Sequence, residues 1–227
     1  MSMQTPSLEA AQAARPARPA QPAGIRITAH VLSYVFHPLF IPTYVTAFLL
    51  YVDPYAFAGM SDKFKLFRLL SVLVNTCFIP AFSVFLMWRL GLIQNIFMRT
   101  QKERVIPYAA ALIFYFWAWY VFHRQPENPD AFTNFLLGSF LAVCVAWFFN
   151  IATKISMHAI AMGGFAMFFL LQAFSQQDVT GFYFSIAVLI AGMVCTARLI
   201  VSDHSQREIY FGFVMGALCQ IVAVWVS

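Results

Sequence analysis

The sequence predicts an all-α membrane protein, a polytopic bundle of six to seven transmembrane helices. Of its 227 residues, 61% are hydrophobic and only 10% are charged, whereas charged residues make up about 25% of a typical soluble domain. Apolar stretches of about 20 residues, the length that an α-helix needs to cross a bilayer, recur along most of the chain. The net charge is a modest +5. Because no basic face with interleaved aromatic residues is present, we expect no nucleic-acid partner.

The composition divides the chain into two regions. Residues 1–24 are rich in Ala, Pro and Gln and have too few apolar side chains to form a core, so we expect a disordered tail. This tail lacks the apolar segment of a secretory signal, and Arg15, Arg18 and, just after it, Arg26 make it basic. Residues 25–227 are interpreted as a single transmembrane helical domain.

The first apolar segment, residues 30–52, is long enough to cross a membrane but contains Pro38 and Pro42. These prolines would kink a helix or make the segment re-entrant, so the sequence leaves open whether it spans. His30 and His37 lie seven positions apart in it. Packing beside the proline kink, or a place near the membrane interface, is the simplest interpretation of both histidines.

The later apolar segments are expected to cross the membrane in turn. Pro80 lies in the middle of the second segment, and Pro107 is placed to open the third helix at its first position. We expect these spans at residues 66–92, 108–122, 131–152, 158–174, 182–201 and 208–226.

Three groups of polar and ionisable residues lie at the ends of these spans. Ionisable residues near membrane depth are costly, so they indicate function by default. Two predicted spans separate each group from the next, which places all three groups on one membrane face. We therefore interpret them as one site for an anionic phosphate. The groups are Arg99, Lys102 and Arg104; Lys154, Ser156 and His158; and Arg198, His204 and Glu208.

The third group has the spacing of an activated histidine. His204 and Glu208 are four residues apart and would share a helix face, so the carboxylate could accept from Nδ1–H and leave Nε2 as the nucleophile or base. Gly212 and Gly216 continue the same stripe and would let a neighbouring helix approach closely. Arg198 offers a guanidinium group, which suits phosphate oxygens.

The other two groups add a second histidine and more positive charge. Lys154 and His158 are one helical turn apart, and Ser156 lies between them at an expected helix start, where free N–H groups bind anions. Together the three groups fit phosphoryl transfer through a phosphohistidine. For the first group, which includes Arg99 and Lys102, a purely topological role under the positive-inside rule stays open.

These residues resemble the type 2 phosphatidic acid phosphatase (PAP2) superfamily, whose third motif is Ser-Arg-x5-His-x3-Asp. Arg198, His204 and Glu208 match this motif, with Glu in place of Asp and Ala197 in place of Ser.

The resemblance extends to the family's other two motifs, Pro-Ser-Gly-His and Lys-x6-Arg-Pro. Ser156-Met157-His158 corresponds to Ser-Gly-His, with Ile155 in place of the proline. Pro107 corresponds to the proline of the remaining motif and Arg99 to its lysine. Ile106 stands at the arginine position, for which Arg104 or Lys102 would substitute from another turn.

The resemblance implies a membrane phosphatase that needs neither metal nor cofactor. His204 would be the nucleophile, Glu208 its orienting partner and His158 the proton donor to the leaving group. The substrate would be a phosphate or diphosphate monoester of a lipid, of the isoprenyl or phosphatidate type. The phosphate would be held by Arg99, Arg104, Ser156 and Arg198.

Two other functions stay open. An inactive lipid-phosphate binder or transporter could use the same frame. A haem or metal protein is a weaker alternative, because Cys77, Cys144, Cys195 and Cys219 stand singly and no two histidines are one turn apart.

We expect a multi-pass protein of a bacterial inner membrane. If the first segment spans, seven helices put the basic tail on the same face as the site, and the positive-inside rule places both in the cytoplasm. If it does not span, six helices remain and the site is extracytoplasmic, which is the arrangement that the resemblance favours.

Overall fold

The computed structural model describes residues 21–96, 101–150, 155–175, 180–201 and 204–227. Within these ranges every regular element is helical, and seven helical stretches are long and apolar enough to cross a membrane. The predicted all-α polytopic bundle is therefore confirmed, with seven candidate spans. Five of them are continuous: α6 (Gln101–His123), α7 (Asp130–Asn150), α8 (Met157–Ser175), α9 (Thr180–Val201) and α10 (Gln206–Val226).

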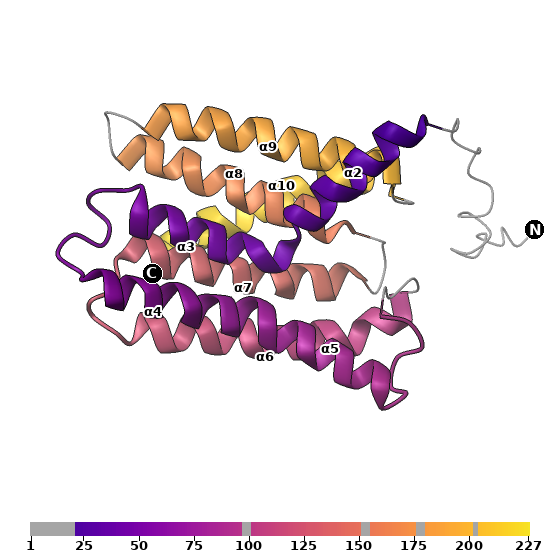
Figure 1. The fold of residues 1–227 in the computed structure, drawn as a ribbon, viewed down its shortest axis with the longest axis horizontal. Coiled ribbons are helices and arrows are strands. Elements are labelled where there is room, and N and C mark those ends of the chain that lie inside the picture. Colours follow the sequence, from indigo (N-terminus) through magenta and orange to yellow (C-terminus); the bar gives the residue numbers. More distant parts are fainter. Residues whose placement is uncertain (1–20, 97–100, 151–154, 176–179, 202–203) are drawn as a thin grey trace, which may run out of the picture.

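The first candidate span is a broken helix. It consists of α2 (Ala23–Val35), the 3-10 turn η1 (Pro38–Phe40) and α3 (Ile41–Tyr51). His37 adopts the extended backbone (φ −65°, ψ 139°) that is favoured before a proline, which explains why the α-helix stops there. The chain continues in the same general direction after the break, so the segment runs the length of the bundle (Figure 1).

The second candidate span changes its winding near a proline. It consists of α4 (Asp62–Leu73), the π-helical turn η2 (Val74–Phe78) and α5 (Ile79–Arg89). Pro80 has no N–H for the carbonyl of Thr76, its partner in a regular α-helix. The Tyr115 hydroxyl of α6 donates to that carbonyl at 3.2 Å, so the carbonyl is satisfied from a neighbouring helix.

The prediction that Pro107 opens the third helix at its first position is wrong. Helix α6 begins at Gln101 and contains Pro107 in its interior. The residues before the proline, QKERVI, are mostly good helix formers. The proline removes only one backbone hydrogen bond, to the carbonyl of Glu103 in the first turn, so the helix can begin earlier than expected.

Helix α8 lies at the centre of the bundle and packs closely on α10. Of the seven candidate spans its residues are the most buried, and those of α4–α5 are the least buried. A Cβ atom on Gly216 would collide with the backbone carbonyl of Ile160, and one on Gly212 would lie 3.1 Å from the carbonyl oxygen of Ser156. The two glycines therefore permit the close helix approach that their spacing predicted.

One end of the bundle collects the starts of α2, α6, α8 and α10 and the ends of α5, α7 and α9, at the right in Figure 1. The described residues of all three polar groups lie at this end. The arrangement agrees with the expectation drawn from the number of predicted spans between the groups.

Candidate functional site

A cavity of about 270 Å³ lies towards this end and is lined by residues of all three polar groups. Arg104 comes from the start of α6, His158 from the start of α8, Arg198 from the end of α9, and His204 from the segment before α10. Apolar and aromatic side chains form most of the remaining wall, among them Pro38, Ile41, Pro42, Pro80, Val84, Tyr115, Phe135 and Val143. The cavity therefore joins a polar, basic part to an apolar part.

His204 makes the contact with Glu208 that the sequence predicted. Its Nδ1 lies 3.2 Å from Glu208 Oε2, and because a carboxylate only accepts hydrogen bonds, Nδ1 carries the proton. The residue is only 5% exposed and lines the cavity. With the proton on Nδ1, Nε2 is the ring nitrogen that carries the lone pair in the neutral imidazole.

Glu208 also belongs to the capping box of α10. The Ser205 hydroxyl accepts from the Glu208 backbone N–H at 3.3 Å, and Glu208 Oε2 accepts from the Ser205 N–H at 2.9 Å. Ser205 and Glu208 thus have the Ser-x-x-Glu spacing of a capping box. The cap holds the carboxylate in place whether or not a ligand is present.

The environment of His204 favours its neutral form. Burial lowers the pKa of His204 to about 4, with smaller contributions from the charges of Arg198 and Arg104, although the hydrogen bond and charge of Glu208 partly oppose the shift. At neutral pH the imidazole is therefore uncharged, with a lone pair on Nε2.

His158 is held by the broken first helix. Its Nε2 lies 3.0 Å from the backbone carbonyl of Ser33, which belongs to the last turn of α2. A carbonyl only accepts, so Nε2 carries a proton and Nδ1 is the nitrogen left for the cavity. The break at His37 makes this carbonyl available, because residues at a helix end lack their usual backbone donors.

Ser156 serves the start of α8 rather than the cavity. Its hydroxyl accepts from the Ala159 backbone N–H at 3.4 Å, which is the predicted cap. The residue is fully buried and is not among those that line the cavity, so the structure does not place its hydroxyl where the sequence-based phosphate contact requires it.

Two arginines bring positive charge to the cavity. Arg198 acts electrostatically on His37, His158 and His204, and Arg104 is hydrogen-bonded to the side chain of Tyr108 one turn further along α6. Both arginines line the cavity.

The other predicted cations are not placed by the structure. Arg99 and Lys154 lie outside the described residues, and so does the side chain of Lys102. Ile106, at the arginine position of the resembled motif, is 47% exposed and does not line the cavity. Within the described chain, Arg104 is therefore the residue of the first group that reaches the cavity.

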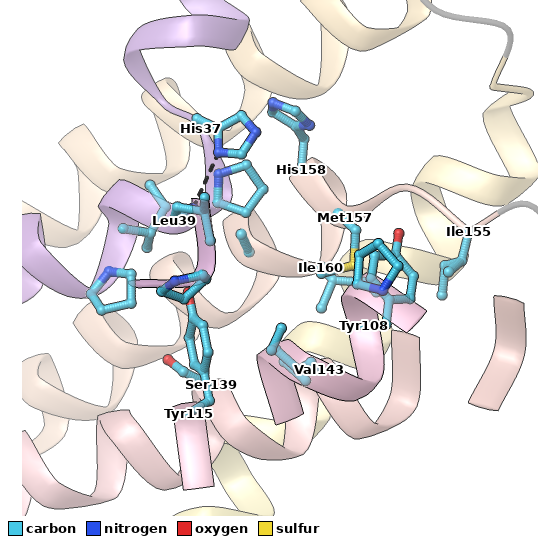
Figure 2. Close-up of a pocket in the computed structure, with 18 of the residues that line it drawn as sticks. His37, Leu39, Tyr108, Tyr115, Ser139, Val143, Ile155, Met157, His158 and Ile160 are labelled. Carbon is cyan, nitrogen blue, oxygen red and sulfur yellow. Dashed lines mark hydrogen bonds between the residues drawn. The ribbon is translucent and has the colours of Figure 1, made fainter. Parts of the chain in front are cut away.

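His37 is a cavity residue that sequence reasoning assigned to packing. It lines the same cavity, and its ring centroid lies 5.3 Å from that of His158 with the rings at 85°. Figure 2 shows the two imidazoles side by side at the edge of the cavity. The signal in the sequence was the His-Pro pair at the kink, whereas His30, seven residues earlier, is exposed.

The described residues combine three imidazoles and two guanidinium groups around one cavity. Among them no group of three or more His, Cys, Asp or Glu side chains is arranged to hold a metal ion. This arrangement can bind an anion and includes one neutral imidazole, that of His204, whose Nδ1 faces Glu208. No protein-family model, curated protein or solved structure matches the chain.

Proposed function

We propose that this protein is an integral-membrane phosphatase that cleaves a phosphate or diphosphate monoester of a lipid through a phosphohistidine. The observation that carries the proposal is the state of His204, which is buried, neutral and held through Nδ1 by Glu208. His204 lines a cavity that is also lined by Arg104 and Arg198. A nucleophilic histidine needs this combination of a fixed tautomer and adjacent phosphate-binding cations.

In this reaction His204 Nε2 attacks the terminal phosphorus atom, and the bond from this phosphorus to the leaving-group oxygen breaks; this oxygen belongs to the lipid alcohol in a monophosphate and bridges the two phosphates in a diphosphate. The negative charge of the bound substrate favours protonation of His158 on Nδ1. This proton passes to that oxygen, and the lipid leaves as an alcohol or as a monophosphate. Water, deprotonated by His158, then attacks the phosphohistidine and releases inorganic phosphate. Arg104 and Arg198 stabilise the negative charge on the transferring group.

The walls of the cavity support a lipid substrate. The part lined by Pro80, Val84 and Phe135 is apolar and lies between candidate membrane spans. Moving a hydrocarbon chain from the bilayer to this apolar part of the cavity would cost little free energy. The phosphate would then lie in the basic part. Isoprenyl diphosphates and phosphatidate-type lipids both have this chemistry.

We further propose that the chain is a divergent member of the PAP2 superfamily. The placement of His158, Arg198 and His204 around one cavity supports this proposal. Arg104 takes the role of the family arginine in place of Ile106, and Met157, which replaces the motif glycine, lines the cavity.

The seven apolar helices indicate a multi-pass membrane protein, and we propose the inner membrane of a bacterium. With seven crossings, the start of α2 and the cavity lie at the same end (Figure 1). The basic residues Arg15 and Arg18 precede α2, so the positive-inside rule favours a cytoplasmic site over the extracytoplasmic one favoured by the resemblance.

A fusion to the C-terminus tests this orientation, because the chain ends at the end of the bundle opposite the cavity (Figure 1). A cytoplasmic site puts the C-terminus in the periplasm. An alkaline phosphatase fused there should be active, and a green fluorescent protein fused there should not fluoresce. The reverse pattern would place the site outside the cytoplasm.

A lipid-phosphate binder or transporter is the second candidate, and the broken first helix favours it. Transporters place interrupted helices beside substrate sites, and the break at His37 and Pro38 lies on this cavity. Such a protein would bind the same ligand without releasing phosphate.

Phosphate release by the purified protein separates the two functions. The assay uses phosphatidate and isoprenyl diphosphate in detergent micelles with a chelator present. A phosphatase releases phosphate, loses at least about 10²-fold in kcat when His204 is changed to Ala, and keeps its rate when the exposed Arg207 is changed to Gln. Equal release by wild type and His204→Ala would contradict the role of His204, and binding without release would favour the transporter.

A further inference from the structure

The broken first helix brings a third imidazole, that of His37, to the cavity. His37 does not belong to any of the three polar groups. His37 and Pro38 both line the cavity with His158, Arg198 and His204. The backbone turns out of α2 at this point and enters η1 with His37 as the residue before the first turn. The break therefore takes His37 out of the regular hydrogen bonding of a helix and places it at the cavity.

The Nδ1 atom of His37 already has a partner. The Leu39 backbone N–H donates to Nδ1 at 3.3 Å, as the dashed line in Figure 2 marks. An N–H group only donates, so Nδ1 holds a lone pair and the proton of the neutral ring is on Nε2. In the described part of the chain no hydrogen bond is formed by Nε2 of His37.

His37 and His158 therefore present opposite hydrogen-bonding groups. His158 uses Nε2–H on the Ser33 carbonyl and keeps the lone pair of Nδ1, whereas His37 uses Nδ1 and keeps Nε2–H. The two rings meet edge to face at 5.3 Å. The pair thus offers one donor and one acceptor, and Arg198 acts electrostatically on both rings.

We propose that His37 is a ligand-binding residue of this cavity and that it donates a hydrogen bond from Nε2 to a phosphoryl oxygen. The proposal rests on the proposed function only for the kind of ligand, a phosphate, and not for its turnover. A helix cap alone would not need an imidazole, because Ser, Asp and Asn cap helices at least as well. The neutral donor adds a directed hydrogen bond to an anion that the arginines attract by charge.

The test is the variant His37→Asn. The Asn oxygen can still accept from the Leu39 N–H and preserve the helix break, but its shorter side chain does not bring a donor to the position of Nε2. His30→Asn is the matched control, because His30 is an exposed histidine of α2, seven residues before His37. Binding of inorganic phosphate and of a short-chain phosphatidate is measured by calorimetry, so the free anion and the lipid headgroup are compared separately.

We expect His37→Asn to weaken phosphate binding by about tenfold, with an unchanged melting temperature, and His30→Asn to bind as the wild type does. Weakened binding of both ligands assigns the contact to the phosphate. Wild-type affinity in a folded His37→Asn variant would overturn the proposal.

A second measurement applies if the variant does not fold. In the ¹⁵N-histidine-labelled wild type, added phosphate should shift the resonance of His37 Nε2 much more than that of Nδ1. No shift of Nε2 at a saturating phosphate concentration would overturn the proposal. If phosphate binding depends on His37 but the protein releases no phosphate, the phosphatase function is contradicted and the role of His37 stands. If phosphate is released at the same rate by wild type and His37→Asn, the phosphatase function stands and the role of His37 is contradicted.

Discussion

One carboxylate oxygen of Glu208 contacts both His204 and Ser205. Glu208 Oε2 lies 3.2 Å from His204 Nδ1 and accepts from the Ser205 backbone N–H at 2.9 Å. The contact that orients the imidazole is thus part of the cap of α10. Because a helix cap does not depend on a ligand, the histidine is held in its reactive tautomer before substrate binds.

Replacing Glu208 by Gln should separate catalysis from folding. Gln also serves in a capping box, but its amide lacks the charge that stabilises His204 as an imidazolium, and its NH₂ group can favour the wrong tautomer. We expect kcat to fall by about 10²-fold to 10⁴-fold with little loss of unfolding stability. Ser205→Ala, which removes a capping bond, should instead lower stability by about 1 kcal/mol. A Glu208→Gln enzyme with wild-type kcat would show that Glu208 is only a cap.

The pKa of His204 predicts how activity and stability depend on pH. Burial lowers this pKa from 6.5 to about 4. Because the protonated imidazole cannot attack, kcat/KM should fall as the pH falls through about 4. The unfolded chain binds a proton first because its histidine titrates near 6.5. This contribution to stability is therefore lost as the pH falls from about 6.5 towards about 4.

Histidine-labelled NMR titration measures this pKa directly, and Glu208→Gln should lower it further by removing the stabilising carboxylate. A midpoint near 6.5 for His204 in the folded protein would contradict the buried site described above.

Arg198→Gln should weaken phosphate binding by about tenfold to a hundredfold, because it removes a charged hydrogen-bond donor from the cavity. Arg198→Lys should restore part of the affinity through its charge. The matched control is Arg207→Gln, since Arg207 is exposed. Calorimetry with inorganic phosphate gives the affinities, and equal losses in the Arg198 and Arg207 variants would indicate a general surface-charge effect.

Two glycine substitutions test the packing that positions the site. Gly216→Ala should destabilise the protein by about 1–3 kcal/mol, because its Cβ would collide with the carbonyl of Ile160 in α8. Gly192→Ala should have no such cost, since a Cβ there meets nothing within 4 Å, and it gains helix propensity. Denaturation in detergent measures both, and equal stabilities would contradict the close α8–α10 contact.

The features that the sequence predicted are those that depend on local spacing. Hydrophobic length indicated the membrane spans, and the number of spans between the polar groups indicated their common face. The His204–Glu208 contact could be predicted because residues four apart share a helix face. Gly212 and Gly216 followed from the same spacing.

The features that the sequence did not predict, apart from the position of Pro107 in α6, depend on contacts between distant segments. The position of His37 beside His158 joins residues far apart in the chain, and no local pattern reports such a contact. Pro107 was misplaced because helix-forming residues before it start α6 earlier. Ser156 was correctly placed at a helix start, but its burial, which keeps its hydroxyl from the cavity, is set by the packing of α8 on α10.

The central claim is that His204 becomes covalently phosphorylated. Its most direct test is rapid acid-free quenching of the protein with ³²P-labelled phosphatidate or isoprenyl diphosphate, followed by peptide mapping. We expect an acid-labile, base-stable label on the peptide that contains His204, formed as fast as turnover and absent from His204→Ala. Phosphate release without this label, or a label on another residue, would contradict it.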